Sequence, residues 1–115
     1  MKYLALIYAA ANTGPQYGTP EFAEFMGGYN TATQRYKTDG VLLAGEGLKP
    51  TSTATTVRVR DGKAETMDGP FAETKETLGG FYLFDCANLD DAIKYAAMIP
   101  SAKFGCVELR PVMDY

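Results

Sequence analysis

One short stretch of the chain gathers several residues that could take part in chemistry. Asp68 precedes a Gly-Pro-Phe71 sequence, and the charged residues Glu73 and Lys75 follow closely. An aspartate beside an aromatic ring can serve as a general base or accept a hydrogen bond from a substrate, because partial burial by Phe71 would raise its pKa. The other interpretation is structural: an aspartate before Gly-Pro favours a tight turn in which the side chain caps its own backbone.

The charged residues after Phe71 also have two interpretations. Glu73 and Lys75 form either a solvated loop or a lid or docking segment. In the second case, Lys75 would offer positive charge to an anionic ligand. We keep Phe71, Glu73 and Lys75 as candidate ligand-binding residues.

Glu46 is the second carboxylate of interest, since it lies between two glycines at the expected end of a strand. Glycines on both sides permit close approach of another backbone or of a ligand. Glu46 is then either an exposed turn residue or the partner of Asp68 across a cleft, where two carboxylates share a proton or bind a cation. Two carboxylates alone do not make a metal site, so we predict no metal and no other cofactor.

Two further residues are candidates for ligand contact. Tyr82 could present its hydroxyl to a cavity, although core packing with a solvated tip is the alternative. Alternation along the last strand could place Arg110 on a face between two sheets, where it would anchor a ligand.

Composition excludes several classes of protein. The 115 residues contain no His, so a Ser-His-Asp triad and a His-based zinc site are absent. The net charge is −3 and the basic residues are scattered, which argues against nucleic acid as the partner. The apolar runs are far shorter than the roughly 20 residues of a membrane span, and the N-terminus does not resemble a signal peptide. We therefore expect one cytoplasmic domain over residues 1–115.

The two cysteines have no expected chemical role. Cys86 and Cys106 fall on strands that should lie on opposite sides of the first strand, too far apart for a disulfide. We expect both to be free, buried thiols. Neither has a neighbour that would lower its pKa, so neither is expected to be a nucleophile.

Hydrophobic periodicity and turn residues predict six strands and two helices. Apolar residues from Phe22 to Tyr36 recur at helical spacing after Thr19-Pro20, which favours a helix over residues 20–38. The Asp61-Gly62 pair predicts a hairpin that sets Arg58 opposite Glu65. The other expected elements are strands over 2–8, 41–48, 80–86 and 105–112, and a helix that Asn88 caps and that buries Leu89, Ala92, Ile93, Ala96 and Ile99.

This order of elements predicts an α+β fold with the ferredoxin-like βαββαβ layout and an inserted β-hairpin. Two helices can cover only one face of the antiparallel sheet, yet strands 41–48 and 80–86 carry apolar residues on both faces. We therefore expect a homodimer that stacks the two open sheet faces, with a cavity between them.

A specific sequence pattern covers residues 68–82 and reads DGPFAETKETLGGFY. It resembles the DGPF proteins of the YCII-related family. The N-terminal MKYLALIY, the segments GVLLAGEGLKP and TTVRVRDGK, and the ending ELRPVM match the same family, so the resemblance covers nearly the whole chain.

The resemblance implies a fold and leaves the activity open. It implies a ferredoxin-like dimeric α/β barrel. Relatives in the wider group are thought to use a His/Asp pair in a cleft, and some are similar to hydrolases or dehalogenases. This chain has no His, so only the aspartate half can be carried over, to Asp68. The family's association with extracytoplasmic-function sigma factors implies a regulatory or partner role.

Two functions therefore stand side by side. The first is a small-molecule-binding or enzymatic homodimer with its cavity near Asp68. The second is a non-catalytic interaction module in which the loop over residues 68–78 docks a partner such as a sigma factor.

Overall fold

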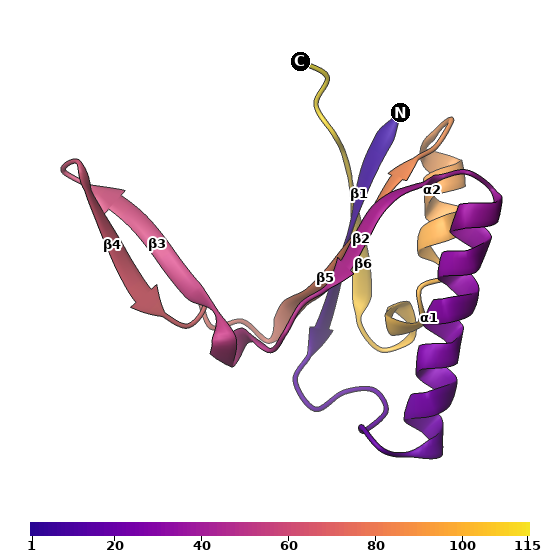
Figure 1. Ribbon diagram of the computed structural model, residues 1–115, viewed down its shortest axis with the longest axis horizontal. Coiled ribbons are helices and arrows are strands. Elements are labelled where there is room, and N and C mark those ends of the chain that lie inside the picture. The colour runs from indigo at the N-terminus through magenta and orange to yellow at the C-terminus, as the bar shows by residue number, and fades with distance from the viewer.

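The computed structural model describes residues 1–115 (Figure 1). Its strands are β1 (Lys2–Ala10), β2 (Leu42–Gly47), β3 (Thr55–Arg60), β4 (Lys63–Asp68), β5 (Glu76–Asp85) and β6 (Cys106–Pro111). Its helices are α1 (Pro20–Thr38) and α2 (Leu89–Ala96), with 3₁₀ turns η1 (Thr51–Thr53) and η2 (Pro100–Lys103). No helix is both long and apolar enough to cross a membrane.

Four strands form the main sheet, in the order β2-β5-β1-β6 with all neighbours antiparallel. Both helices lie on one side of this sheet (Figure 1). The α+β, ferredoxin-like prediction is confirmed, including the two helices on one face. We call the side that no helix covers the open face.

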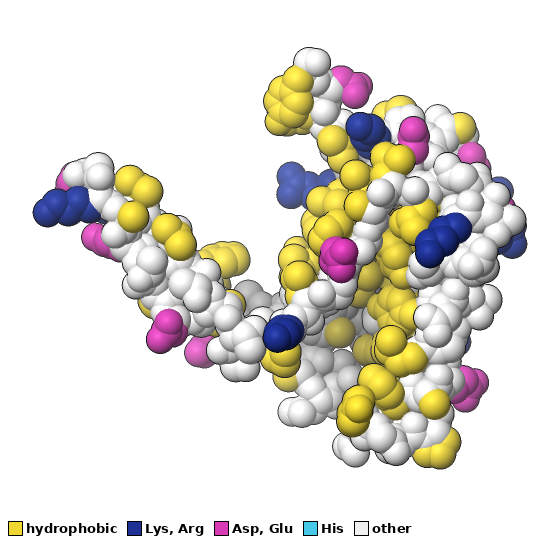
Figure 2. Space-filling view, viewed as in Figure 1, with side chains coloured by type: hydrophobic (Ala, Val, Ile, Leu, Met, Phe, Trp, Pro, Cys, Tyr) yellow, Lys and Arg dark blue, Asp and Glu magenta, His cyan; other side chains and the backbone are white.

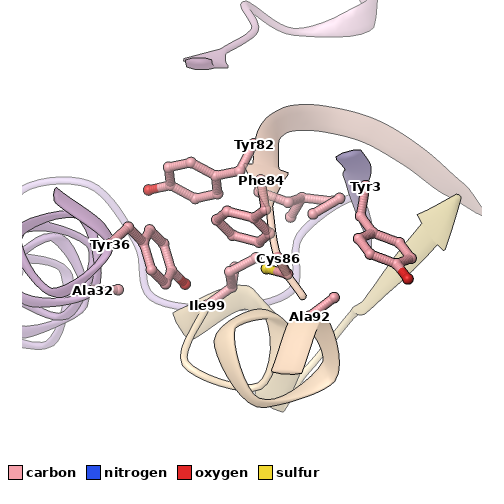
Figure 3. Close-up of a cluster of buried hydrophobic side chains, with 10 residues drawn as sticks. Tyr3, Ala32, Tyr36, Tyr82, Phe84, Cys86, Ala92 and Ile99 are labelled. Atoms are coloured by element: carbon pink, nitrogen blue, oxygen red, sulfur yellow. The ribbon is translucent and has the colours of Figure 1, made fainter. Parts of the chain in front are cut away.

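Alternation along the central strands decides which side chains form the core. Residues Tyr3, Ala5 and Ile7 of β1 are buried under the helices, as are Tyr82 and Phe84 of β5. Tyr36 of α1 packs its ring edge against the rings of Tyr82 and Phe84, at centroid separations of 5.1 and 4.8 Å (Figure 3). Its hydroxyl donates a 2.7 Å hydrogen bond to the carbonyl of Tyr95, so this buried polar group is satisfied.

The intervening residues of the same strands project to the open face. Leu4 and Leu6 of β1 pair with Leu83 and Phe81 of β5, and all four side chains are half-buried. Glu108 and Arg110 lie opposite Leu6 and Leu4 on the edge strand β6. The open face therefore has an apolar centre and charged residues at its edge.

The first helix starts and ends as the sequence predicts. The Thr19 hydroxyl accepts a 3.1 Å hydrogen bond from the Phe22 amide, and Pro20 takes the first helical position. Of the expected apolar face, however, only Ala32 and Tyr36 are fully buried. The N-terminal half of α1 covers the sheet incompletely.

Two predictions about burial are wrong. Leu89 and Ile93 of α2 are 48% and 50% exposed, because the helix has only eight residues and no other element covers its outer side. Ala92 and Ala96 are buried, as is Ile99, which lies beyond the end of the helix. Cys106 is exposed rather than buried, since it begins the edge strand β6. Cys86 is buried, and both thiols are free as expected.

The inserted hairpin has the predicted register, with Arg58 opposite Glu65, although the two side chains form no ion pair. Its turn residues Asp61 and Gly62 both have positive φ, of 52° and 76°, as a two-residue hairpin turn requires. Strands β3 and β4 pair only with each other, in a separate two-stranded sheet. We call residues 55–68 the arm, because in Figure 1 this hairpin projects away from the main sheet on its open side. The strand after it, β5, begins at Glu76, four residues earlier than expected.

Candidate functional site

A groove of about 660 Å³ lies between α1 and strands β2 and β5, on the helix-covered side of the sheet. Figure 2 shows hydrophobic side chains along the hollow between this helix and the sheet. Its wall comes from α1, with Phe25, Met26, Tyr29, Thr33 and Lys37. Its floor comes mainly from β2 and β5, and Ser101 of η2 closes one side.

Missing side chains create the floor of the groove. Gly45 pairs with Tyr82 and Gly47 pairs with Gly80, so these glycines face the helices. A Cβ atom on Gly80 would lie 2.8 Å from the Glu46 carbonyl oxygen, and one on Gly45 would lie 2.6 Å from the Tyr82 ring. Neither position admits a larger residue without a shift of its neighbours. A Cβ atom on Gly47 would instead enter open space.

Two pairs of hydroxyl groups lie along the groove. The Tyr29 hydroxyl is 2.7 Å from Ser101 Oγ, and the Thr33 hydroxyl is 2.8 Å from the Tyr82 hydroxyl. Burial raises the pKa of Tyr29, so its hydroxyl stays neutral at physiological pH. Each pair can still accept or donate a hydrogen bond to a bound molecule.

Lys37 is the charged side chain on the helical wall, and it belongs to neither of the two ion pairs of the structure. Glu46 also borders the groove. Its register partner is Phe81, whose side chain alternates toward the open face, so Glu46 meets the groove with its backbone. The side-chain charge at the groove is therefore positive.

The groove contains only two of the residues that the sequence singles out, Tyr82 and Glu46. Tyr82 lies under the helices and not on the open face: its ring is buried in the core and its hydroxyl reaches Thr33 at the groove. Arg110 lies on the open face opposite Leu4, as the alternation of β6 predicts, and it forms no ion pair.

Asp68 is the last residue of the arm and lies outside the groove. Its side chain is exposed and makes no hydrogen bond, so it does not cap the turn that follows. That turn is held instead by the Gly69 amide, which donates to the Ala54 carbonyl at 2.7 Å, and by the Thr56 hydroxyl, which donates to the Gly69 carbonyl. The ring of Phe71 is 74% exposed.

Glu73 and Lys75 are exposed in the segment between β4 and β5, without ion pairs. Glu46 and Asp68 belong to different sheets, and no hydrogen bond joins them. No group of three or more Cys, Asp or Glu side chains is close enough to hold a metal ion. The structure thus leaves the candidate residues of the 68–75 segment exposed to solvent, and no hydrogen bond or ion pair joins them to Glu46.

Sequence reasoning missed the polar residues of the wall. Tyr29 belongs to the apolar series from Phe22 to Tyr36, and Thr33 and Lys37 follow it at every fourth position, so the three form one stripe along α1. This spacing was available in the sequence. Ser101 carries no comparable signal, because only the fold brings η2 next to Tyr29.

Comparison with known proteins places the chain in a family. A model of the YCII-related domain matches residues 1–115. An uncharacterized protein of Rhizobium meliloti (strain 1021) is 38% identical over 117 residues, which cover 100% of this chain and 94% of the relative. The chain therefore belongs to the YCII-related family.

Proposed function

We propose that this protein binds a small organic molecule with an apolar body and an anionic group, in the groove between α1 and the β2-β5 floor. The observation that carries this proposal is the floor itself, where Gly45 and Gly80 allow close packing and Gly47 faces open space beneath an aromatic wall. Sites for small molecules are concave and mostly apolar, with a few well-placed polar groups. The groove has this composition.

Each part of the groove fits one part of such a ligand. Phe25, Met26 and the ring of Tyr29 offer apolar contact to the body of the molecule. The hydroxyl pairs offer hydrogen bonds, and Lys37 offers the charge for a carboxylate or phosphate. The groove presents no thiol, imidazole or carboxylate side chain, so we propose binding and assign no reaction to it.

We also propose that the protein acts as a homodimer through the open face. Leu4, Leu6, Phe81 and Leu83 form the apolar centre of this face, and Arg110 lies at its edge. An apolar centre with a polar rim is typical of protein interfaces. Asp68 lies outside the groove of its own chain. We therefore propose that it contacts a ligand only in the assembled dimer.

The groove is tested by filling it. In Gly47→Val, the new side chain enters open space on the floor, and a β-branched residue suits a strand. The variant should fold normally and lose binding of carboxylates, measured by NMR titration with benzoate, indole-3-acetate and octanoate. The matched control is Gly27→Ala, which also enlarges a glycine with open space around it but lies outside the groove.

The charge preference is tested at Lys37. Lys37→Met keeps the aliphatic length and removes the cation, so carboxylate affinity should fall by about tenfold, the loss of one charged contact. The corresponding neutral amides should bind both proteins equally. The proposal is wrong if Gly47→Val binds the panel as well as the wild type, or if no member of the panel shifts a groove resonance.

A role as a docking module is the second candidate. The observation that favours it is the exposed segment after the arm, in which Phe71 projects into solvent beside Glu73 and Lys75. Titration of an extracytoplasmic-function sigma factor from the same cell would test it. Binding that Phe71→Ala abolishes and Gly47→Val leaves intact would favour docking over the groove.

A further inference from the structure

The arm lacks the contacts that would hold it in place. Strands β3 and β4 pair only with each other, and neither makes more than marginal contact with another helix or strand. An isolated two-stranded hairpin is at best marginally stable in water, and a third strand or a packed surface is needed to stabilise it. The arm therefore needs a contact that a single chain does not provide.

The register of the arm sorts its side chains by chemistry. On one side Val57 lies opposite Thr66 and Val59 lies opposite Ala64, and Asp68 at the base is the only charge. The other side carries the arginines of β3, Glu65 and Lys63, with Thr56 and the exposed Met67 near the base. The valines are 61% and 62% exposed. We call the first side the valine side of the arm.

The accessible surface area of the single chain is also larger than that of a compact monomer of this mass. The single chain exposes 8303 Å². A compact monomer of 12.5 kDa exposes only about 6,200 Å². The excess of roughly 2,000 Å² is more than the 800 Å² or so that each partner buries in a standard interface.

We propose that the valine side of the arm packs against a second copy of this chain. The proposal rests on the homodimer proposed above and adds the segment that clasps it. A second copy is the occupant favoured by position, since the arm leaves the main sheet on the open side, where the copies would meet (Figure 1). Figure 2 shows hydrophobic side chains along the edge of the arm nearer the sheet.

The length of the arm fits this occupant. Strands of six residues extend about 20 Å, and stacked sheets lie about 10 Å apart, so the arm can reach the body of a partner. A two-fold dimer repeats every contact, so each chain would clasp the other with its own arm. Asp68 lies on the valine side and is carried into the same contact.

The test compares two pairs of substitutions on one strand. Val57→Ser with Val59→Ser alters the valine side, and Arg58→Ser with Arg60→Ser makes the same change on the other side. Sedimentation equilibrium should show a dimer that the valine variant weakens about tenfold or more, since two apolar contacts are lost from each of its two arms. The dissociation constant of the arginine variant should stay within about threefold of the wild-type value.

Because the arm has few contacts with the main sheet and helices, neither variant should unfold them. Circular dichroism should therefore give the same spectrum for the folded body in both variants. A dimer that the valine variant leaves unchanged overturns the clasp and leaves the open-face dimer standing. A wild-type protein that is still monomeric at about 100 µM overturns both the clasp and the open-face dimer, since a stable interface would form at that concentration.

A photo-crosslinker at Val59 identifies the occupant directly. In a mixture of ¹⁴N- and ¹⁵N-labelled chains, the proposal requires adducts that join one label to the other. Adducts within one chain, or adducts in cells mainly to other proteins, would show that a second copy is not what the arm binds.

Discussion

At the scale of single residues, Asp39 at the end of α1 joins two elements. Its carboxylate accepts a 2.7 Å hydrogen bond from the Arg35 guanidinium and a 2.8 Å hydrogen bond from the Tyr95 hydroxyl. The bond from Arg35, followed by that from Tyr95, lowers the pKa of Asp39 below its ordinary value. Asp39 therefore ties the C-terminal end of α1 to α2.

The lowered pKa of Asp39 gives the stability a pH dependence. Because the folded pKa lies below the unfolded value of about 3.9, the contribution is complete above that pH and is lost as pH falls through the folded value. We expect Asp39→Asn to lower the melting temperature at neutral pH, with the difference from wild type disappearing in acid. Thermal unfolding between about pH 7 and pH 2 measures this.

Asp114→Asn is the matched control, since Asp114 follows the last strand and forms no ion pair. It should melt with the wild type at every pH. An Asp39→Asn deficit that persists undiminished in acid would show that the charge is not the cause.

The sequence shows which residue types are chemically suited to a site, but it does not show their surroundings. Asp68 stands out because Gly-Pro-Phe follows it, but that pattern does not say that the side chain lies on a projecting hairpin. The carboxylate is what makes Glu46 a candidate in the sequence, whereas the groove uses the glycine backbone on either side of it. Both outcomes depend on which strands pair, and pairing is a long-range property.

At the scale of elements, the two adjacent glycines of α1 occupy different environments. A Cβ atom on Gly27 would meet nothing within 4 Å, whereas one on Gly28 would lie 3.0 Å from Cγ of Pro100. Only Gly28 thus has a packing reason to lack a side chain. Gly27 destabilises the helix, and no packing contact requires a glycine there.

We expect Gly27→Ala to stabilise the protein by about 1 kcal/mol, the difference in helix propensity between the two residues. Gly28→Ala should gain less or should destabilise, because the helix propensity is offset by the contact with Pro100. Urea unfolding of the two variants beside the wild type decides the matter. Equal gains in the free energy of unfolding would mean that the contact between the new Cβ atom at position 28 and Pro100 is not destabilising.

The elements themselves could be predicted because their signals are local. The spacing of apolar residues in α1, its Thr19 cap and the Asp61-Gly62 turn each lie within a few residues of what they specify. The extension of β5 back to Glu76 could not, because it depends on pairing with Ala10 at the far end of β1. The groove is a further step away, since it arises where glycines of β2 and β5 meet.

At the scale of the whole molecule, the shape of the chain is the main finding. Its radius of gyration is 16.1 Å, whereas a compact domain of this length has about 13 Å. The arm and the open face account for this extended form, and the sequence predicts the uncovered sheet but not the projecting hairpin. Under the homodimer that we propose, a second chain would supply this missing burial.

If a second chain stabilises the arm, the arm's protection from hydrogen exchange must depend on protein concentration. Backbone amides of β3 and β4 should be protected when the dimer predominates and should exchange far faster on dilution, because the free hairpin is only marginally stable. Amides that join β1 to β5 in the main sheet should change much less, since the buried core of each chain also holds them. Exchange followed by mass spectrometry over a dilution series measures both sets in one experiment. Arm amides that stay protected in the dilute monomer would mean that the hairpin is stable by itself, and its exposed valines would then need another explanation.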